Sequence, residues 1–441
     1  MRASGQGCVR SVFSTPLSSL PGLRRSQTAA LRIAGYHRRH IHWISSGTLL
    51  ARAARAHRAP TTKFQAGARP ASVAARRSSS GEATPSNRST DPTMASSPRV
   101  LVFGTGSVGA VYAWILAQAV TPSNVYCICR SNYTVASTKG FTINSTIFGQ
   151  NLVLKPNVSH SVDEAVSLLP PGEKFDYVVV TAKAIPSTPS IAEQLRPAIG
   201  PKTIVALIQN GIGVEEPYAT LYPDNPLLSC VVYLPATQVS QGVIVHREID
   251  LLQIGTYPSD SPTHQSAAES FSTLLKSGGG ATEVHSDIQP QRFSKLLVNA
   301  AWNPICALSL SRDVEFLHSS PPDISLNLIK SVMLEISQIA QACGYSNINA
   351  DTVEFQINRA KVRELPGVEP SMLADAKVHA RMEVDAIVGN AVRLAESKGV
   401  ETPLLRGIYA LVKALDLSFA REREGKFVGS ENGDLNGKNK T

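Results

Sequence analysis

The chain has few of the cysteines on which disulfide-linked and zinc-bound folds depend. Its 441 residues include six cysteines, and these are too scattered for a disulfide framework. No group of Cys and His residues has the spacing of a zinc site, so we expect no metal. An uninterrupted apolar run of about 18 residues, the length that spans a membrane, is also missing. The hydrophobic fraction of 43% is nevertheless sufficient for a sizeable core, and the length allows two or three domains.

Acidic residues are absent from the first 80 positions, which contain 13 Arg and one Lys. The formal net charge of +9 therefore comes entirely from this segment. Nucleic-acid binding would need a basic patch on a folded face, so the overall charge does not indicate it. We expect neither a nucleic acid nor a membrane as a partner.

The basic segment has the composition of a mitochondrial transit peptide, which is rich in Arg and Ser and poor in acid. We assign residues 1–96 to a targeting or disordered leader, of which 78–93 is a polar linker. The alternative is a start at Met94, directly before the first apolar strand. The leader predicts a mitochondrial protein, whereas translation from Met94 predicts a cytoplasmic one.

A glycine-rich turn lies between a predicted strand, 99–103, and a predicted helix, 110–119, and a second strand follows at 125–129. The turn consists of Gly104, Thr105, Gly106, Ser107, Val108 and Gly109. This order is typical of a βαβ unit that binds a dinucleotide. The first glycine makes the tight turn, the second admits the pyrophosphate, and the third allows close helix packing. A turn without a ligand, or one for FAD or a methyl donor, is the alternative.

The rest of the chain divides into two halves. Apolar strands at 177–181 and 203–208 alternate with helical segments, which predicts a parallel sheet covered on both faces. Extended segments within 227–256 add strands and a possible antiparallel edge. From about residue 285 the pattern predicts helices, at 290–308, 324–343, 352–362, 372–398 and 403–420. We therefore predict an α/β domain of the Rossmann type over 97–285, an all-α domain over 286–421 and a disordered tail over 422–441.

The residue that selects the cofactor follows the second strand. Position 129 lies twenty residues after Gly109, where NAD enzymes place an acidic residue on the ribose 2′-hydroxyl. This chain has Cys129 there, followed by Arg130. No carboxylate repels a 2′-phosphate, and Arg130 can pair with one bidentately. The sequence predicts NADP(H) rather than NAD(H), unless Arg130 is only a solvated loop cation.

A polar row lies on the otherwise apolar helix predicted at 290–308. Lys295, Asn299 and Asn303 are spaced four residues apart, so they share roughly one face. This pattern indicates a site, although a snorkelling lysine with two capping or core amides is the alternative. Pro304 is expected to kink the helix. Farther along, Glu383 lies among apolar residues on the helix predicted at 372–398, and Ser371 fits a helix N-cap.

Five motifs occur in one order along residues 97–420, and together they resemble those of ketopantoate reductase (2-dehydropantoate 2-reductase). They are Gly104–Gly109, Ala182-Lys183-Ala184, Gln209-Asn210-Gly211-Ile212-Gly213, Lys295-x3-Asn299-x3-Asn303-Pro304, and Pro370-Ser371-Met372-Leu373 with Glu383. The glycine motif is generic, but the others are specific as a set. The resemblance implies a Rossmann domain followed by a helical domain like that of 6-phosphogluconate dehydrogenase.

The resemblance also implies an activity and a role for each motif residue. The expected reaction is the NADPH-dependent reduction of 2-dehydropantoate to (R)-pantoate in pantothenate biosynthesis. Lys295 would be the general acid and Glu383 would orient it or the substrate, a small 2-oxo acid. Asn299, Asn303, Ser371 and Asn210 would bind substrate. Asn210 would also lie beside the nicotinamide, and Lys183 and Arg130 would contact the cofactor. The expected assembly is a monomer or a homodimer.

Two other functions fit the sequence. Paralogues in the same superfamily can keep the lysine and the asparagines and act on another branched 2-oxo acid. A catalytically silent NADP(H)-binding sensor is the other possibility, and the presence of both Lys295 and Glu383 argues against it.

Replacing Arg130 with Ala is expected to weaken NADPH binding by about tenfold or more, the loss of one charge-assisted contact. NADH lacks the 2′-phosphate, so its binding should change little. Fluorescence titration of each cofactor measures the two dissociation constants. Equal losses for NADPH and NADH would remove the basis for the cofactor choice.

Overall fold

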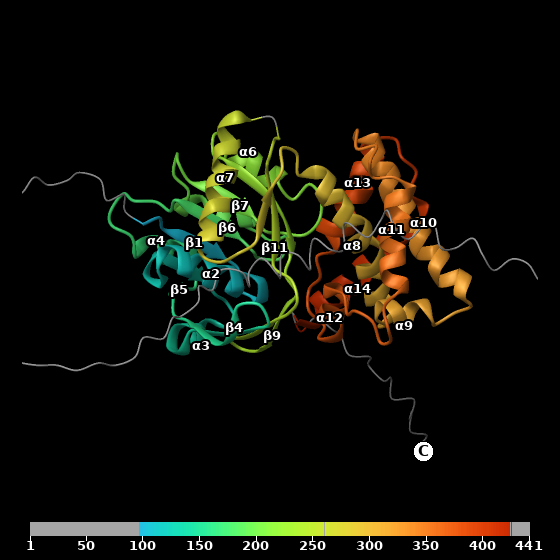
Figure 1. Cartoon of the computed structure of the whole chain (residues 1–441), viewed down its shortest axis with the longest axis horizontal. Coiled ribbons are helices and arrows are strands. Elements are labelled where there is room, and N and C mark those ends of the chain that lie inside the picture. The colour runs from blue at the N-terminus through green and yellow to red at the C-terminus, as the bar shows by residue number, and fades with distance from the viewer. Residues whose placement is uncertain (1–96, 260, 424, 426–441) are drawn as a thin grey trace, which may run out of the picture. The chain divides into compact units, whose positions relative to one another are not determined.

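The computed structural model describes residues 97–259, 261–423 and 425. The predicted leader, 1–96, lies entirely outside these residues, as does most of the predicted tail, and the mitochondrial location stays a prediction. The described chain has a sheet-bearing half, coloured blue to yellow in Figure 1, and a helical half, coloured gold to red. The predicted combination of an α/β domain and an all-α domain is confirmed.

The main sheet has eight strands in the order β12-β11-β8-β7-β6-β1-β2-β5. Its strands are β1 (Val100–Phe103), β2 (Val125–Ile128), β5 (Asn157–Ser159), β6 (Tyr177–Val180), β7 (Ile204–Leu207), β8 (Leu227–Tyr233), β11 (Leu251–Thr256) and β12 (Thr282–Val284). The strands from β8 to β5 are parallel, and β11 pairs antiparallel with β8. Strands β1, β2 and β6 are buried along their whole length, as expected for a parallel sheet covered on both faces.

A second sheet accounts for the remaining strands. Its order is β4-β3-β10-β9, with β3 (Phe141–Ser145), β4 (Gly149–Leu154), β9 (Ala236–Ser240) and β10 (Val243–His246). Helix α2 (Ser107–Val120) contacts strands of both sheets, so most of its residues are buried and it has no polar face. The segment 227–256 thus contributes strands to both sheets. It supplies the predicted antiparallel strand, β11, but β12 lies outside β11 and forms the edge of the main sheet.

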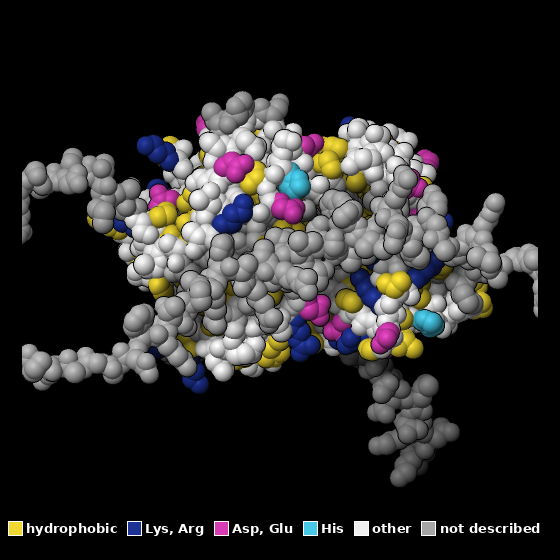
Figure 2. Space-filling view, viewed as in Figure 1, with side chains coloured by type: hydrophobic (Ala, Val, Ile, Leu, Met, Phe, Trp, Pro, Cys, Tyr) yellow, Lys and Arg dark blue, Asp and Glu magenta, His cyan; other side chains and the backbone are white. Residues whose placement is uncertain are grey.

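Helices cover the main sheet and connect its strands. Helix α7 (Pro262–Ser277) packs beside α2 against β8, β11 and β12. The other connecting helices are η1 (Pro122–Asn124), α3 (Tyr133–Lys139), α4 (Val162–Ser167), α5 (Ile191–Gln194), η2 (Arg196–Ala198) and α6 (Glu216–Leu221). On the face drawn in Figure 2, basic and acidic side chains of the described residues are interspersed.

The helical half is built around α8 (Gln289–Ser309), which contacts most of the other helices. These are α9 (Asp313–Leu317), α10 (Pro322–Ala342), α11 (Ala350–Lys361), α12 (Ser371–Lys377), α13 (Asn390–Ser397), α14 (Pro403–Arg423) and the π-helical turn η3 (Asp385–Gly389). Helix α8 continues through Pro304, and twelve of its residues are buried. No helix of the described ranges has both the length and the hydropathy to cross a membrane.

The predicted long helix 372–398 is wrong. Helix α12 ends at Lys377, and the chain becomes helical again only after Glu383. His379 has a φ of 49°, and Asp416 of α14 accepts hydrogen bonds from Arg381 and from the backbone N–H of Met382 (2.8 Å). These distant contacts replace helical hydrogen bonds, so Glu383 lies at a helix break.

Ser371 was expected to be a helix N-cap, and this too is corrected. It is the first residue of α12, whose N-cap is Pro370. The extended backbone of that proline, with ψ of 154°, sets the start of the helix.

Candidate active site

The glycine-rich turn between β1 and α2 leaves open space where a phosphate would bind. A Cβ on Gly104 (φ +94°) would lie 2.5 Å from Ala182, and one on Gly109 would lie 2.5 Å from Thr181, so packing requires both glycines. A Cβ on Gly106 would meet nothing within 4 Å. The amides of residues 107–109 donate to no acceptor among the described residues. This helix N-terminus therefore fits the pyrophosphate of a dinucleotide.

The segment after β2 is tied to the same turn. Asn132 is buried, and its Nδ2 donates to the carbonyl oxygen of Thr105 at 2.8 Å. Arg130, two residues earlier, is exposed, as a residue that meets a ligand phosphate must be. The backbone N–H of Gln238 in β9 donates to Ser107 Oγ at 2.9 Å, which places the second sheet beside the turn. Gln238 was not identified from the sequence because nothing local marks it.

Three predicted residues form one hydrogen-bonded chain. Lys295 Nζ donates to Asn210 Oδ1 at 3.0 Å and also to the carbonyl oxygen of Val232. Asn210 Nδ2 donates to Glu383 Oε2 at 3.2 Å, and Glu383 Oε1 accepts from the amide of Ala184 at 3.0 Å. The side-chain amide of Asn210 thus connects Lys295 to Glu383.

The fold brings this chain together from both halves. Ala184 follows β6 and Asn210 follows β7, and the glycine turn follows β1, so all lie at the carboxyl edge of the parallel strands. In open α/β sheets this edge binds ligands. Lys295 comes from α8 and Glu383 from the helix break before η3.

The environment shifts the proton affinities of both charged residues. Burial lowers the pKa of Lys295 to about 7, and the nearby Arg292 acts in the same direction, whereas Glu383 opposes the shift. Burial raises the pKa of Glu383, against the hydrogen bonds from Ala184 and Asn210. A lysine with a pKa near neutrality can donate a proton readily, which suits a general acid.

The predicted substrate amides separate into two places. Asn299 lines a narrow pocket together with Asn210 and Lys295; the rest of its wall consists of Gln209, Gly211, Val231, Arg292 and Leu296. Asn303 of α8 is 3% exposed, and its side chain faces the first residues of α12. Its Oδ1 is 3.4 Å from the backbone nitrogen of Met372 and 3.5 Å from Ser371 Oγ. Asn303 and Ser371 are therefore brought together, but neither lines that pocket.

Lys183, predicted at the cofactor, is held by the helical half. Its Nζ lies 2.5 Å from Oδ1 of Asp375 in α12. The lysine is exposed, and the carboxylate is partly buried. Burial raises the pKa of Asp375, and the Lys183 charge opposes that shift.

The turn that carries Asn210 docks onto the π-helical turn η3. Gly211 has a φ of +102°, and a Cβ there would lie 2.2 Å from the carbonyl oxygen of Ala386. That oxygen accepts from the amide of Ile212 at 3.1 Å. At the end of η3 the backbone N–H of Asn390 donates to the carbonyl oxygen of Asp385. In an α-helix it would instead donate to the carbonyl oxygen of Ala386, so the π-helical turn leaves the Ala386 carbonyl available.

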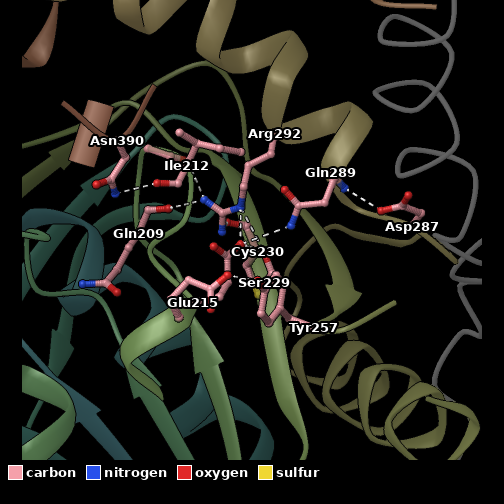
Figure 3. Close-up of polar contacts among 12 residues, drawn as sticks. Gln209, Ile212, Glu215, Ser229, Cys230, Tyr257, Asp287, Gln289, Arg292 and Asn390 are labelled. Atoms are coloured by element: carbon pink, nitrogen blue, oxygen red, sulfur yellow. Dashed lines mark hydrogen bonds and ion pairs between the residues drawn. The ribbon is translucent and has the colours of Figure 1, made fainter. Parts of the chain in front are cut away.

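An ion pair that the sequence analysis missed lies beneath this turn (Figure 3). Arg292 Nε lies 2.8 Å from Glu215 Oε1, and the two side chains are 3% and 0% exposed. Arg292 precedes Lys295 by one helical turn on the same face of α8, which is the only signal in the sequence that relates it to the site.

The sequence matches one family over both halves. Residues 100–259 match the family described as "Ketopantoate reductase PanE/ApbA", and residues 287–416 match "Ketopantoate reductase PanE/ApbA C terminal". The chain is 28% identical to the uncharacterized protein YDL144C of Saccharomyces cerevisiae, covering 74% of this chain and 96% of that one. It is 27% identical to 2-dehydropantoate 2-reductase of Nostoc sp., covering 74% and 97%.

Solved structures have the same fold. The structure of 2-dehydropantoate 2-reductase from Methylococcus capsulatus is similar with a TM-score of 0.63 at 28% identity, covering 73% of this chain and 98% of that one. D-mandelate dehydrogenase with NADH and anilino(oxo)acetate has the same TM-score at 19% identity, covering 73% and 99%. The second likeness concerns the fold alone.

Replacing Glu383 with Gln is expected to lower the pKa of Lys295 below about 7, because the carboxylate charge that favours the ammonium is lost. The measurement is the pH dependence of Lys295 acylation by an amine reagent, followed by peptide mass spectrometry.

Asp385→Asn is the matched control, because that carboxylate binds Tyr409 and Lys413 rather than Asn210. Its Lys295 labelling curve should coincide with that of the unaltered protein. An unchanged curve in Glu383→Gln would contradict the electrostatic coupling of the two residues.

Proposed function

The chain belongs to the ketopantoate reductase family, and from that premise we propose that it reduces 2-dehydropantoate to (R)-pantoate with NADPH, a step of pantothenate biosynthesis. Membership confirms the coarser predictions of an oxidoreductase and of a nicotinamide cofactor, since ketopantoate reductase and related dehydrogenase structures bind NAD(P)H. The observation that carries the proposal is the hydrogen-bonded chain from Lys295 through Asn210 to Glu383 at the carboxyl edge of the sheet.

The residues of this chain fit the proton half of the reaction. When bound, the reduced nicotinamide supplies a hydride to the ketone carbon. The ketone oxygen then gains an electron pair and negative charge, and the Lys295 ammonium stabilises that charge and donates the proton that completes the alcohol. Asn210 keeps the ammonium directed by accepting one of its hydrogen bonds, and Glu383 fixes the orientation of that amide.

The cofactor would be held at three places. The free amides at the start of α2 would bind the pyrophosphate. Arg130, exposed after β2, would pair with the 2′-phosphate. Lys183 would contribute a second cation by leaving Asp375. The monomer or homodimer expected from the sequence stays a prediction.

A reductase of another branched 2-oxo acid is the second candidate. The first relative named above has no assigned reaction, and D-mandelate dehydrogenase has the same fold. Both candidates use the same lysine and differ only in the substrate.

The direct test is NADPH oxidation by the protein with 2-dehydropantoate and a panel of other 2-oxo acids. We expect turnover that prefers 2-dehydropantoate and falls by at least about 100-fold in Lys295→Ala, the loss of one general acid. Preference for another 2-oxo acid would establish the second candidate. Cofactor binding without any turnover would overturn both, as would full activity in Lys295→Ala.

The pH dependence of reduction follows from the lowered pKa of Lys295. The ammonium form donates the proton, so kcat/KM is expected to be constant below pH about 7 and to fall above it, by roughly tenfold per pH unit. Stopped-flow or steady-state rates between pH 5.5 and about 9 measure this limb. A rate that stays level across that range would exclude Lys295 as the titrating acid.

A further inference from the structure

We propose that Arg292, paired with Glu215, is a positioning residue that orders the Asn210 turn and places a positive charge one helical turn from Lys295. The inference rests on the proposed function, because it concerns the same proton donor. It assigns a role to a buried ion pair whose arginine also lines the pocket beside Lys295.

The guanidinium of Arg292 binds the carbonyl groups of the two residues that flank Asn210. Its Nη1 donates to the carbonyl oxygen of Gln209 at 3.1 Å and to that of Gly211 at 2.9 Å (Figure 3). These two bonds fix the backbone on either side of the amide that binds Lys295. The left-handed Gly211 makes this turn tight enough for one guanidinium nitrogen to bind both oxygens.

The same guanidinium ties α8 to β8. Its Nη2 donates to the carbonyl oxygen of Cys230 at 3.2 Å, and its Nε donates to Ser229 Oγ at 2.9 Å. One helical turn later, Lys295 Nζ binds the carbonyl oxygen of Val232 on the same strand. Arg292 therefore fixes the place of α8 along β8 just before the lysine.

Stability alone is a weak reason for this arrangement. A fully buried ion pair loses its hydration, and replacing such a pair with neutral side chains is often harmless to folding. Glu215 Oε1 accepts from Ser229 Oγ at 2.6 Å and lies 3.4 Å from Gln289 Nε2, but its Oε2 is buried without a partner among the described residues. The hydrogen-bonding capacity of the pair is thus only partly used. What the pair does provide is a fixed position for Arg292 and its positive charge.

The charge of Arg292 acts on Lys295 directly. Two cations three residues apart on one helix face repel each other, which favours the neutral lysine. Burial and this repulsion act together to lower the pKa of Lys295. A planar guanidinium can combine the fork of hydrogen bonds with the charge, whereas a lysine would supply the charge alone.

Two variants separate position from charge. Arg292→Lys keeps the positive charge but cannot make the forked contacts, so kcat should fall by about tenfold or more while the alkaline limb stays in place. Arg292→Met with Glu215→Gln removes both charges and leaves no unpaired ion. In this double variant kcat should fall similarly, and the fall of kcat/KM at alkaline pH should begin about one pH unit higher.

The control is Arg363→Met, which removes the partner of Asp313, a carboxylate that is also buried but lies beyond the far end of α8. It is expected to lower the melting temperature without moving the limb. NADPH affinity, from fluorescence titration, should be unchanged in this control.

Failure of this inference is distinguishable from failure of the proposed function. Acylation of Lys295 at varied pH, quantified on its peptide, reports its pKa without any substrate. A protein that reduces no 2-oxo acid overturns the proposed function, whereas its labelling curve still tests Arg292. An identical labelling curve in the double variant, or full kcat in Arg292→Lys, would overturn the inference. If the double variant does not fold, kcat and labelling of Arg292→Lys decide.

Discussion

A lysine that donates a proton near neutral pH must hold its ammonium group where the charge is poorly solvated. Lys295 meets this condition because α8 carries it into the core of the site, where burial lowers its pKa to about 7. Such a partly buried group depends on its hydrogen-bond partners for its position. The amide of Asn210 and the carbonyl of Val232 provide those partners, and the surrounding structure holds them in place.

The partners of Lys295 depend on contacts between the two halves of the described chain. Glu383 binds the amide of Ala184 and the side chain of Asn210, and Ala386 accepts from Ile212. A widened π-helical turn makes the last contact possible, and a glycine without Cβ makes it close enough. The pair Lys183–Asp375 joins the halves at a more exposed point. A relative shift of the halves would therefore change the environment of the proton donor directly, because the same bonds serve both purposes.

Local signals in the sequence were sufficient for some of these features. The glycine turn was predictable because strand, turn and helix are adjacent, and the spacing of Lys295, Asn299 and Asn303 defined one helix face. The break before Glu383 was not predictable, since it depends on Asp416 in α14. The ion pair of Arg292 and Glu215 was not predictable for the same reason. Its members are far apart in the chain, and only the fold brings the buried cation to the buried carboxylate. The second sheet was missed because its strands come from two separated segments.

The distribution of these features explains why motifs define the reaction more closely than the substrate. Lys295 and Glu383 both bind Asn210, so in the proposed reaction they would fix how a proton reaches a ketone oxygen. The pocket wall beside them includes Val231 and Leu296, and the Tyr233 ring lies 5.2 Å from Lys295 Nζ. Val231 and Tyr233 belong to none of the motifs and come from β8, which pairs with β7 and β11 in the sheet. If the chain reduces 2-oxo acids as proposed, selection among them would depend on the shape and polarity of this strand, and it could change while Lys295 and its supports stay the same.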